Sequence, residues 1–412
     1  MKSALRIALI ASSRFPISQP FAGGLEAHVW HLARGLTAYG HEVSVFAAPG
    51  SDRDLDCHTL PVRPLAMSDA ARGDVSMPPD AFMADHHAYL ALMLQLAGAS
   101  RDDFHIIHNH SLHYLPVAMA RMLPTPMLTS VHTPPTPWLE SAIDASGGAG
   151  TQFAAVSAHT AAAWGKALGH IAVVPNGIAT DRWPLGPGGG PLVWFGRITP
   201  EKAPHLAIAA ARLARRPLVL AGPIADQRYF TAEVAPNLDE EIRYVGHLNH
   251  NELARLVGGS AAALITPVWD EPYGLVVAEA MCCGTPVVAF ACGGIPELLA
   301  PQAGRLVPAK DTSAMADAIA EVVRMPRDQV RDHAVRHCSL EAMLAAYINL
   351  YRQIIDNRSE VRHDRLLRTP SRLRTSGAGD QHRRRNVSAD DGADFVGHPT
   401  AAPLYGGRET TA

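Results

Sequence analysis

The hydrophobic positions of the chain alternate between short continuous runs and runs that recur every three or four residues. Residues 5–11 form a short apolar run, which is typical of a buried parallel strand. Residues 25–39 carry apolar side chains at helical spacing and are followed by Gly40. Residues 42–47 form the next apolar run. This order of strand, helix and strand predicts a right-handed βαβ unit.

The alternation continues to a break rich in Pro and Gly at residues 183–190, where neither helix nor strand is favoured. We therefore predict an N-terminal domain over residues 1–184 and a C-terminal domain over residues 190–340. In the first domain we expect further strands at 104–108, 127–131, 153–156 and 172–174, and helices at 86–97 and 158–167.

The same pattern restarts after the break. We expect strands at 192–196, 218–221, 242–245, 263–266 and 287–289, and helices at 205–214, 251–256, 275–283 and 312–323. The predicted fold class is α/β, with two Rossmann-like, doubly wound domains that face each other across a cleft. Ligands of such sheets bind beyond the carboxyl ends of the strands, so the cleft is the predicted site.

The C-terminal part divides into a helix and a tail. Residues 340–355 form a strongly amphipathic pattern, and we assign 341–357 to one helix. Beyond residue 358 the chain is rich in Arg, Ser, Gly, Asp and Thr, which predicts a disordered tail over 358–412. A solvated tail is the simpler interpretation, and Arg383-Arg384-Arg385 leave a peripheral contact with an anionic membrane surface open.

Composition narrows the class of protein. The 412 residues are 47% hydrophobic, enough for two full cores, and a net charge of −3 disfavours a nucleic-acid partner. Five cysteines without the spacing of a disulfide framework indicate a reducing compartment. Because no apolar run approaches the length of a membrane span, we expect a cytoplasmic location.

The segment Glu271-Pro-Tyr-Gly-Leu-Val-Val-Ala-Glu279 carries the strongest chemical signal. It places one carboxylate before a glycine turn and another inside the helix that follows. Both carboxylates can reach the hydroxyls of one ligand above the helix N-terminus, where free N–H groups favour phosphate. The segment therefore predicts a site for a sugar nucleotide.

Other polar residues follow predicted strands at the same edge. Arg197 and Lys202 follow the first strand of the second domain, where two cations can hold a diphosphate. Gly23 and Gly24 follow the first strand of the chain and allow close backbone approach to a ligand and strained dihedral angles. A second turn, Gly293-Gly294 before Glu297, is a candidate for covering the other side of the ligand.

His132 follows the 127–131 strand and can donate or accept a hydrogen bond at a sugar hydroxyl. The chain has 21 histidines, so most of them are expected to be structural. A zinc site is a weaker alternative because the nearby histidines lack a supporting carboxylate or cysteine set. Its candidate ligands are His105, His108, His110 and His113.

Taken together, these segments resemble the retaining glycosyltransferases of the GT-B fold, and in particular glycosyltransferase family 4. The resemblance spans about residues 5–355 and rests on motifs that include Gly23-Gly-Leu-Glu-Ala-His-Val, Gly40-His-Glu-Val, Val174-Pro-Asn-Gly-Ile, Phe195-Gly-Arg-Ile, Val245-Gly-His-Leu, Glu271-Pro-Tyr-Gly-Leu-Val-Val-Ala-Glu279, Gly284-Thr-Pro-Val-Val-Ala and Gly293-Gly-Ile-Pro-Glu297. One departure is Ala203, where many relatives carry glycine.

The resemblance implies a role for each candidate residue. Glu279 would bind the ribose and Glu271 the donor sugar, while Arg197 and Lys202 would neutralise the diphosphate. The remaining donor-binding and catalytic candidates are the backbone N–H groups of Tyr273, Gly274 and Leu275, the close approach of Gly23 and Gly24, and His132 beside the reacting carbon. The helix over 341–357 would cross back to the first domain.

The implied reaction is retaining transfer of a hexosyl group from a UDP- or GDP-type sugar, with no metal and no other cofactor. The acceptor is left open among small molecules, lipids and polysaccharides. Two alternatives from other classes remain: a nucleotide-sugar epimerase or phosphorylase on the same scaffold, and a sugar-nucleotide-binding protein without turnover.

Overall fold

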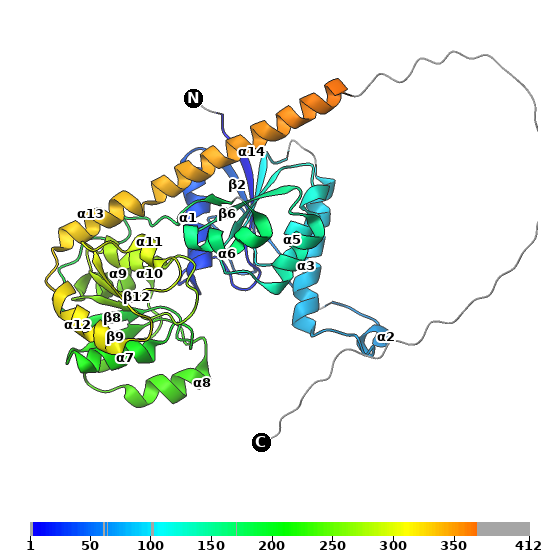
Figure 1. Ribbon diagram of the computed structural model, residues 1–412. Helices are drawn as coiled ribbons and strands as arrows, with labels where there is room; N and C mark the ends of the chain where they lie inside the picture. The colour runs from blue at the N-terminus through cyan, green and yellow to red at the C-terminus, as the bar shows by residue number, and fades with distance from the viewer. Residues whose placement is uncertain (1–2, 61, 64, 100–102, 170, 369–412) are drawn as a thin grey trace, which may run out of the picture. The chain divides into compact units, whose positions relative to one another are not determined.

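A computed structural model describes residues 3–60, 62–63, 65–99, 103–169 and 171–368. The chain up to His363 forms one compact unit that contains two parallel β-sheets (Figure 1). Each sheet is flanked by helices, so the structure confirms the predicted fold class of two doubly wound α/β halves.

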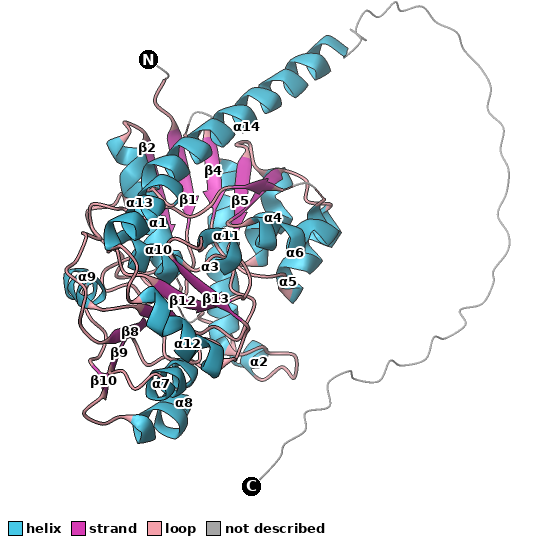
Figure 2. Cartoon of the chain, turned by 60° about the vertical axis from the view of Figure 1, so that its left-hand side comes forward, coloured by secondary structure: helices cyan, strands magenta, loops and turns pink. Residues whose placement is uncertain are grey.

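The first sheet has the strand order β3-β2-β1-β4-β5-β6-β7. Figure 2 labels four of its strands, β2, β1, β4 and β5. Its strands are β1 (Arg6–Ile10), β2 (Glu42–Ala47), β3 (Cys57–Thr59), β4 (Ile106–Asn109), β5 (Met127–Val131), β6 (Thr151–Ala155) and β7 (Ala172–Val173). The sequence pattern missed β3, which has only three residues and no fully buried side chain. The order changes direction between β1 and β4, the position at which doubly wound sheets bind ligands.

The second sheet has the order β10-β9-β8-β11-β12-β13. Its strands are β8 (Leu192–Phe195), β9 (Leu218–Ala221), β10 (Ile242–Tyr244), β11 (Ala263–Ile265), β12 (Val287–Phe290) and β13 (Gly304–Val307). The missed strand β13 lies at the sheet edge, where Arg305 faces outward and pairs with Glu321. An edge strand with a charged face lacks the continuous apolar run that identifies a central strand.

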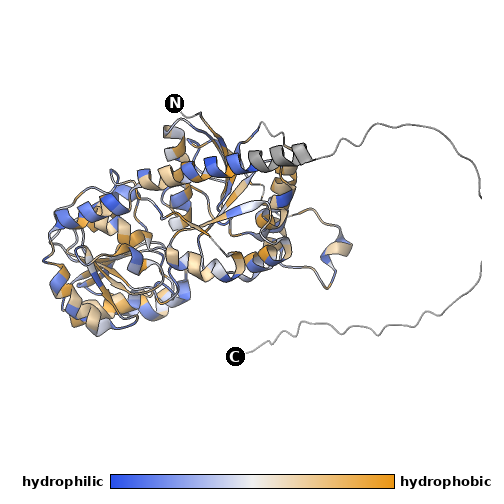
Figure 3. Ribbon diagram, turned by 45° about the horizontal axis from the view of Figure 1, so that its top comes forward, coloured by the Kyte–Doolittle hydropathy of each residue, from blue (hydrophilic) through white to orange (hydrophobic). Residues whose placement is uncertain are grey.

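Helices cover both sheets, and the hydrophobic colour concentrates on the strands (Figure 3). Those of the first half are α1 (Gly24–Ala38), α2 (Asp69–Arg72), α3 (Asp80–Gly98), α4 (Tyr114–Met119), η1 (Ala120–Met122), α5 (Pro137–Ser146) and α6 (Ala158–Leu168). Those of the second half are α7 (Pro204–Leu213), α8 (Gln227–Tyr229), η2 (Phe230–Val234), η3 (Ala235–Asn237), α9 (His250–Gly259), α10 (Leu275–Cys282), α11 (Ile295–Leu298), α12 (Thr312–Val322) and α13 (Arg327–His337).

The last helix, α14 (Leu340–Arg368), returns to the first half of the chain, as predicted for the crossover helix (Figure 1). Tyr347 and Tyr351 are fully buried in the core that also contains β1 and α1. Removing a buried aromatic ring of this size costs about 3–5 kcal/mol, so α14 contributes strongly to that core. The helix extends to Arg368, past its predicted end at residue 357, and the remainder of the predicted tail, residues 369–412, lies outside the described part.

The break predicted between the halves is a packed segment. Gly186 donates its N–H to the carbonyl of Cys283 at 3.1 Å, and Gly190 donates to that of Gly259 at 2.9 Å. The Arg327 guanidinium on α13 donates to the carbonyls of Gly186 and Gly258 at 3.0 and 2.8 Å. The glycines therefore allow two backbones to pass closely, because an added Cβ at Gly186 would lie 2.2 Å from a carbonyl oxygen.

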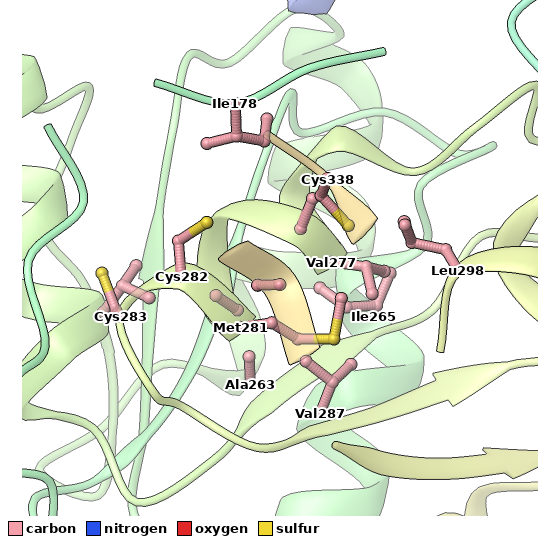
Figure 4. Packing of buried hydrophobic residues seen from close by; sticks show 14 of the residues in the cluster. Ile178, Ala263, Ile265, Val277, Met281, Cys282, Cys283, Val287, Leu298 and Cys338 are labelled. Atoms are coloured by element: carbon pink, nitrogen blue, oxygen red, sulfur yellow. The ribbon is translucent and has the colours of Figure 1, made fainter. Parts of the chain in front are cut away.

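Helix α10 is held in the middle of the second core. Its Val277 and Met281 pack with Ala263 and Ile265 of β11 and with Val287 of β12 (Figure 4). Cys282, Cys283 and Cys338 lie in the same core as free thiols, and burial raises the pKa of each. The rigid packing fixes the position of the N-terminal end of α10, where the predicted carboxylates lie.

Candidate active site

A cavity of about 530 Å³ opens at the carboxyl ends of the strands and is lined by both halves of the chain. All ten site residues predicted from the sequence line this cavity. They are Gly23, Gly24, His132, Arg197, Lys202, Glu271, Tyr273, Gly274, Leu275 and Glu279. Their roles stay predictions, but the fold brings them to one place.

Glu271 and Lys202 form an ion pair on the cavity wall, with the lysine Nζ at the carboxylate Oε2. Trp269 donates its indole N–H to the same oxygen at 2.8 Å, and its ring lies 5.0 Å from the lysine nitrogen. Lys202 follows β8 and Glu271 follows β11, and these strands are neighbours in the sheet. The pairing thus results from strand order.

Arg197 reaches Glu201 at 3.9 Å and is 37% exposed, so its guanidinium remains available to the cavity. The sequence pattern missed Glu26, a buried carboxylate on the first turn of α1 that also lines the cavity. Burial raises the pKa of Glu26, while the charges of Arg197 and Arg14 lower it. An acidic residue two positions after the Gly23-Gly24 pair was the signal that could have identified it.

The first glycine turn provides close approach rather than a strained backbone. Gly23 is extended at φ −166°, so it does not need the left-handed region. A Cβ at Gly24 would lie 2.6 Å from Cδ1 of Leu275 in the other half. The structure therefore shows a close approach of Gly24 to Leu275 and no left-handed backbone at Gly23, while the approach of these glycines to a ligand stays a prediction.

Gly274 precedes α10 with φ +97°, a conformation that favours glycine, and leaves the helix N-terminus at the cavity. Glu279 lies one turn into α10, and burial raises its pKa to about 7. Among the described residues its carboxylate has no hydrogen-bond or ion-pair partner. A ligand hydroxyl could therefore supply what the protein does not.

The Tyr273 side chain makes its hydrogen bond within the protein. Its hydroxyl donates to the backbone carbonyl of Asn176 at 2.8 Å, and burial raises its pKa. This bond joins the 271–275 loop to the first half of the chain. A donor-binding role for Tyr273 therefore depends on its backbone N–H alone.

Neither Gly293 nor Gly294 of the second glycine turn lines the cavity, so its predicted contact with a ligand gains no support. Gly294 donates its N–H to the carbonyl of Glu271 at 2.7 Å, and a Cβ at Gly293 would lie 2.0 Å from that oxygen. The turn supports the backbone of Glu271 from behind. Glu297 accepts hydrogen bonds from the N–H groups of Ala158 and His159 at 2.8 and 2.6 Å, and so caps α6 across the two halves.

His132 lies among other histidines at the ends of β4 and β5. Its Nε2 lies 2.9 Å from Nδ1 of His110, and its ring centroid lies 4.9 Å from that of His28. Burial lowers the pKa of His132 to about 4, so the imidazole is neutral at pH 7. His28 was missed by the sequence pattern, although it lies one helical turn after Gly24 and lines the same cavity.

The zinc alternative from the sequence is wrong in its ligand set. His105 accepts a hydrogen bond from the N–H of Arg6 at 2.9 Å, and His113 caps α4 through the N–H of Leu115 at 3.2 Å. His108 uses both ring nitrogens in hydrogen bonds. These three histidines are structural.

Two sequence profiles match the halves of the chain. Residues 22–182 match the profile described as Glycosyltransferase Family 4, and residues 190–325 match the profile described as Glycosyl transferases group 1. Together they cover more than two thirds of the chain and both walls of the cavity. The chain belongs to glycosyltransferase family 4.

Known proteins agree with this assignment. This family 4 chain is 29% identical over 345 residues to glycogen synthase of Mycobacterium tuberculosis (strain ATCC 25618 / H37Rv), covering 74% of this chain and 83% of the relative. The fold is similar to that of sucrose-phosphate synthase from Thermosynechococcus elongatus, with TM-score 0.69, 21% identity and coverage of 86% and 100%. Anabaena HepE, solved in complex with UDP-glucose, gives TM-score 0.64, 17% identity and coverage of 86% and 100%.

These similarities confirm the GT-B fold and the glycosyltransferase class of this family 4 enzyme. Within the described residues no helix is both long and apolar enough to cross a membrane. The departure noted at Ala203 has a structural counterpart, since this residue adopts φ +48° directly before α7. Glycine adopts that conformation without the steric cost that an alanine carries.

Proposed function

We propose that this enzyme transfers a hexosyl group from a UDP- or GDP-type sugar to an acceptor hydroxyl, with retention at the anomeric carbon and without a metal. One observation carries the proposal. Two cations, Arg197 and Lys202, line one cavity with the N-terminus of α10 and the carboxylates of Glu271 and Glu279. This set matches the phosphates in the middle of a sugar nucleotide and the hydroxyls at its two ends.

The donor would lie along α10. Glu279 would accept hydrogen bonds from the ribose, and the free N–H groups at Gly274 and Leu275 would hold phosphate or sugar oxygens. Glu271 would accept from a hydroxyl of the donor sugar. The UDP-glucose complex of the structurally similar Anabaena HepE supports a nucleotide-sugar donor.

The reaction breaks the bond between the anomeric carbon and the diphosphate oxygen. The acceptor hydroxyl forms the new bond from the same face, and its proton moves to the departing phosphate oxygen. Arg197 and Lys202 would stabilise the charge that develops on the diphosphate, which is the largest contribution a protein can make here. These cations and the helix end would replace a divalent ion in that role.

His132 would act as a neutral hydrogen-bond partner near the reacting carbon. Burial lowers its pKa to about 4, so at pH 7 it adds no positive charge to the cavity. A neutral imidazole with so low a pKa is better suited to positioning a sugar hydroxyl than to proton transfer. Closure of the two halves around the donor would exclude water and limit hydrolysis.

The test begins with the donor. Thermal unfolding is measured with UDP-, GDP-, ADP- and dTDP-sugars in buffer that contains EDTA, since a bound donor raises the unfolding temperature. The best donor is then incubated with a panel of acceptors, and the anomeric configuration of the product is read by proton NMR. We expect a UDP- or GDP-sugar to stabilise the chain and the product to keep the donor's configuration. An inverted product, or transfer that stops in EDTA, would overturn the proposal.

A further inference from the structure

Four histidines converge where β4 and β5 end beside α1, and they fall into two kinds. His108 is satisfied, because its Nδ1 lies 2.6 Å from the Tyr351 hydroxyl and its Nε2 lies 2.8 Å from the Ser130 hydroxyl. It is a structural residue of the core. His28, His110 and His132 form the second kind and face one another.

Polar atoms in this second group lack partners. In the described part of the chain, both ring nitrogens of His28 and Nε2 of His110 are buried without a hydrogen bond of normal geometry. The Asn176 amide lies near His28 and partly offsets the lowering of its pKa, but its Oδ1 is also buried without such a bond. The side chains of His28 and His110 are 3% and 0% exposed. A buried imidazole with unused nitrogens is costly unless a ligand or an ion supplies the missing contact.

We propose that His28, His110 and His132 form a binding site for a divalent transition-metal ion of the zinc class. One ring nitrogen of each residue lies within 4.8 Å of those of the other two. Zn–N bonds of about 2.0–2.1 Å require nitrogens roughly 3.4 Å apart, a shift that small side-chain rotations provide. Three imidazoles and no oxygen ligand select zinc, cobalt, nickel or copper over magnesium and calcium.

The three imidazoles can bind an ion at neutral pH, and the site is accessible from the cavity. Burial lowers the pKa of all three imidazoles, so each has a lone pair available at pH 7. His28 and His132 also line the donor cavity, which gives an entry path and leaves a fourth coordination position for water or a ligand. In such an arrangement the ion replaces the present contact between His110 and His132.

The site has a consequence that rests on the proposed function. There, His132 positions a sugar hydroxyl and no metal takes part. An ion bound to His132 removes that imidazole and adds positive charge next to the reacting carbon. Zinc therefore inhibits transfer by this enzyme, whereas magnesium has no effect.

Binding is tested on the full chain without a histidine tag, after chelator treatment, by titration with Co²⁺ and displacement by Zn²⁺. We expect one Co²⁺ per chain with the visible absorption of a low-coordinate site. His28→Gln should weaken binding at least tenfold. The matched control is His337→Gln, which removes one member of the His333/His337 pair on α13, whose ring centroids lie 4.7 Å apart.

A His28→Gln variant that binds Co²⁺ within twofold of the natural chain would overturn the proposal, as would loss of the signal in His337→Gln. X-ray absorption of the zinc-loaded natural chain gives a measurement that does not depend on a folded variant. Three imidazoles in the first shell support the site, and two or fewer exclude it. Both measurements need no substrate, so they remain decisive if the proposed transfer reaction fails.

Discussion

The Lys202 ammonium and the Glu271 carboxylate are paired across 69 positions of sequence, and the same carboxylate oxygen accepts the indole N–H of Trp269 at 2.8 Å. Each charged group neutralises the other. A sugar nucleotide that brings phosphates to Lys202 and hydroxyls to Glu271 can replace or share this pair. The pair therefore keeps two charged groups in position before the donor binds.

The first prediction concerns this pair. Glu271→Gln keeps the shape of the side chain but removes the charge that holds Lys202 and accepts the sugar hydroxyl. A hydrogen bond to a charged group is worth about 1.5–3 kcal/mol, so kcat/KM for transfer should fall by about 10- to 100-fold. Steady-state kinetics checks this, with circular dichroism to confirm the fold.

The control is Glu321→Gln, which removes an exposed carboxylate that pairs with Arg305 at 2.9 Å. Exposed pairs contribute about 0–1 kcal/mol, and this one is outside the cavity, so transfer should not change. Full activity of Glu271→Gln would remove Glu271 from the proposed machinery.

A second prediction tests the support behind Glu271. In Gly293→Ala, the new Cβ would lie 2.0 Å from the carbonyl oxygen of Glu271 and displace its backbone. Misplacing a catalytic group by about 1 Å can cost 100-fold in rate, and we expect a loss of that order in kcat.

The matched control is Gly189→Ala. Gly189 has φ +81°, and an added Cβ there would meet no atom within 4 Å, so this substitution introduces backbone strain without a clash. Both variants should lose stability, and only Gly293→Ala should lose transfer in the same kinetic assay. Equal activity of the two variants would show that the glycine turn does not position Glu271.

A third prediction concerns pH. Burial raises the pKa of Glu279 to about 7, and hydroxyl donors would favour its charged form. If only the charged form binds well, the Kd of a nucleotide sugar should be roughly tenfold weaker at pH 6 than at pH 8. Isothermal titration calorimetry across this range measures the effect, and Glu279→Gln should bind weakly with little pH dependence.

Protonation of Glu279 should weaken donor binding but stabilise the folded chain without a ligand. Because the pKa of Glu279 in the folded chain lies above its ordinary value of 4.5, the protonated carboxyl stabilises the ligand-free chain. This contribution is complete below about pH 4.5 and is lost as the pH rises through 7. An affinity that does not change between pH 6 and pH 8 would contradict a role for the Glu279 carboxylate in donor binding.

A fourth prediction tests the strain at Ala203, which has φ +48°. The left-handed region costs a non-glycine residue about 1–2 kcal/mol, and loss of a buried methyl group costs about 0.8 kcal/mol. Ala203→Gly should therefore raise the free energy of unfolding by about 0.5 kcal/mol. Urea denaturation measures this value.

Ala207→Gly removes the same atoms from a fully buried position inside α7, where glycine costs about 1 kcal/mol in helix propensity. This variant should be destabilised, so the two substitutions should differ by about 2 kcal/mol. Equal destabilisation would mean that packing of the Ala203 methyl group outweighs its backbone strain.

The sequence determined much of the fold because its signals are local. Central parallel strands are buried on both faces and give continuous apolar runs, as in β5 and β12. The spacing of Glu271 and Glu279 around a glycine turn also indicated that one carboxylate precedes a helix and the other lies inside it. Helices rich in charged residues gave no such signal. Helix α13 is mostly polar on its outer face. The last part of α14, up to Arg368, has the composition of a tail, although Arg, Glu and Leu are good helix formers.

Tertiary structure alone decided which side chains meet. Lys202 pairs with Glu271 because β8 and β11 are neighbours in a sheet, and no periodicity encodes strand order. His28 meets His110 and His132 because α1 lies beside the ends of two later strands. The histidines that cluster in the structure therefore differ from the set that the sequence suggested for zinc. Local pattern specifies what each element is, whereas the burial of distant apolar faces against one another specifies which elements touch.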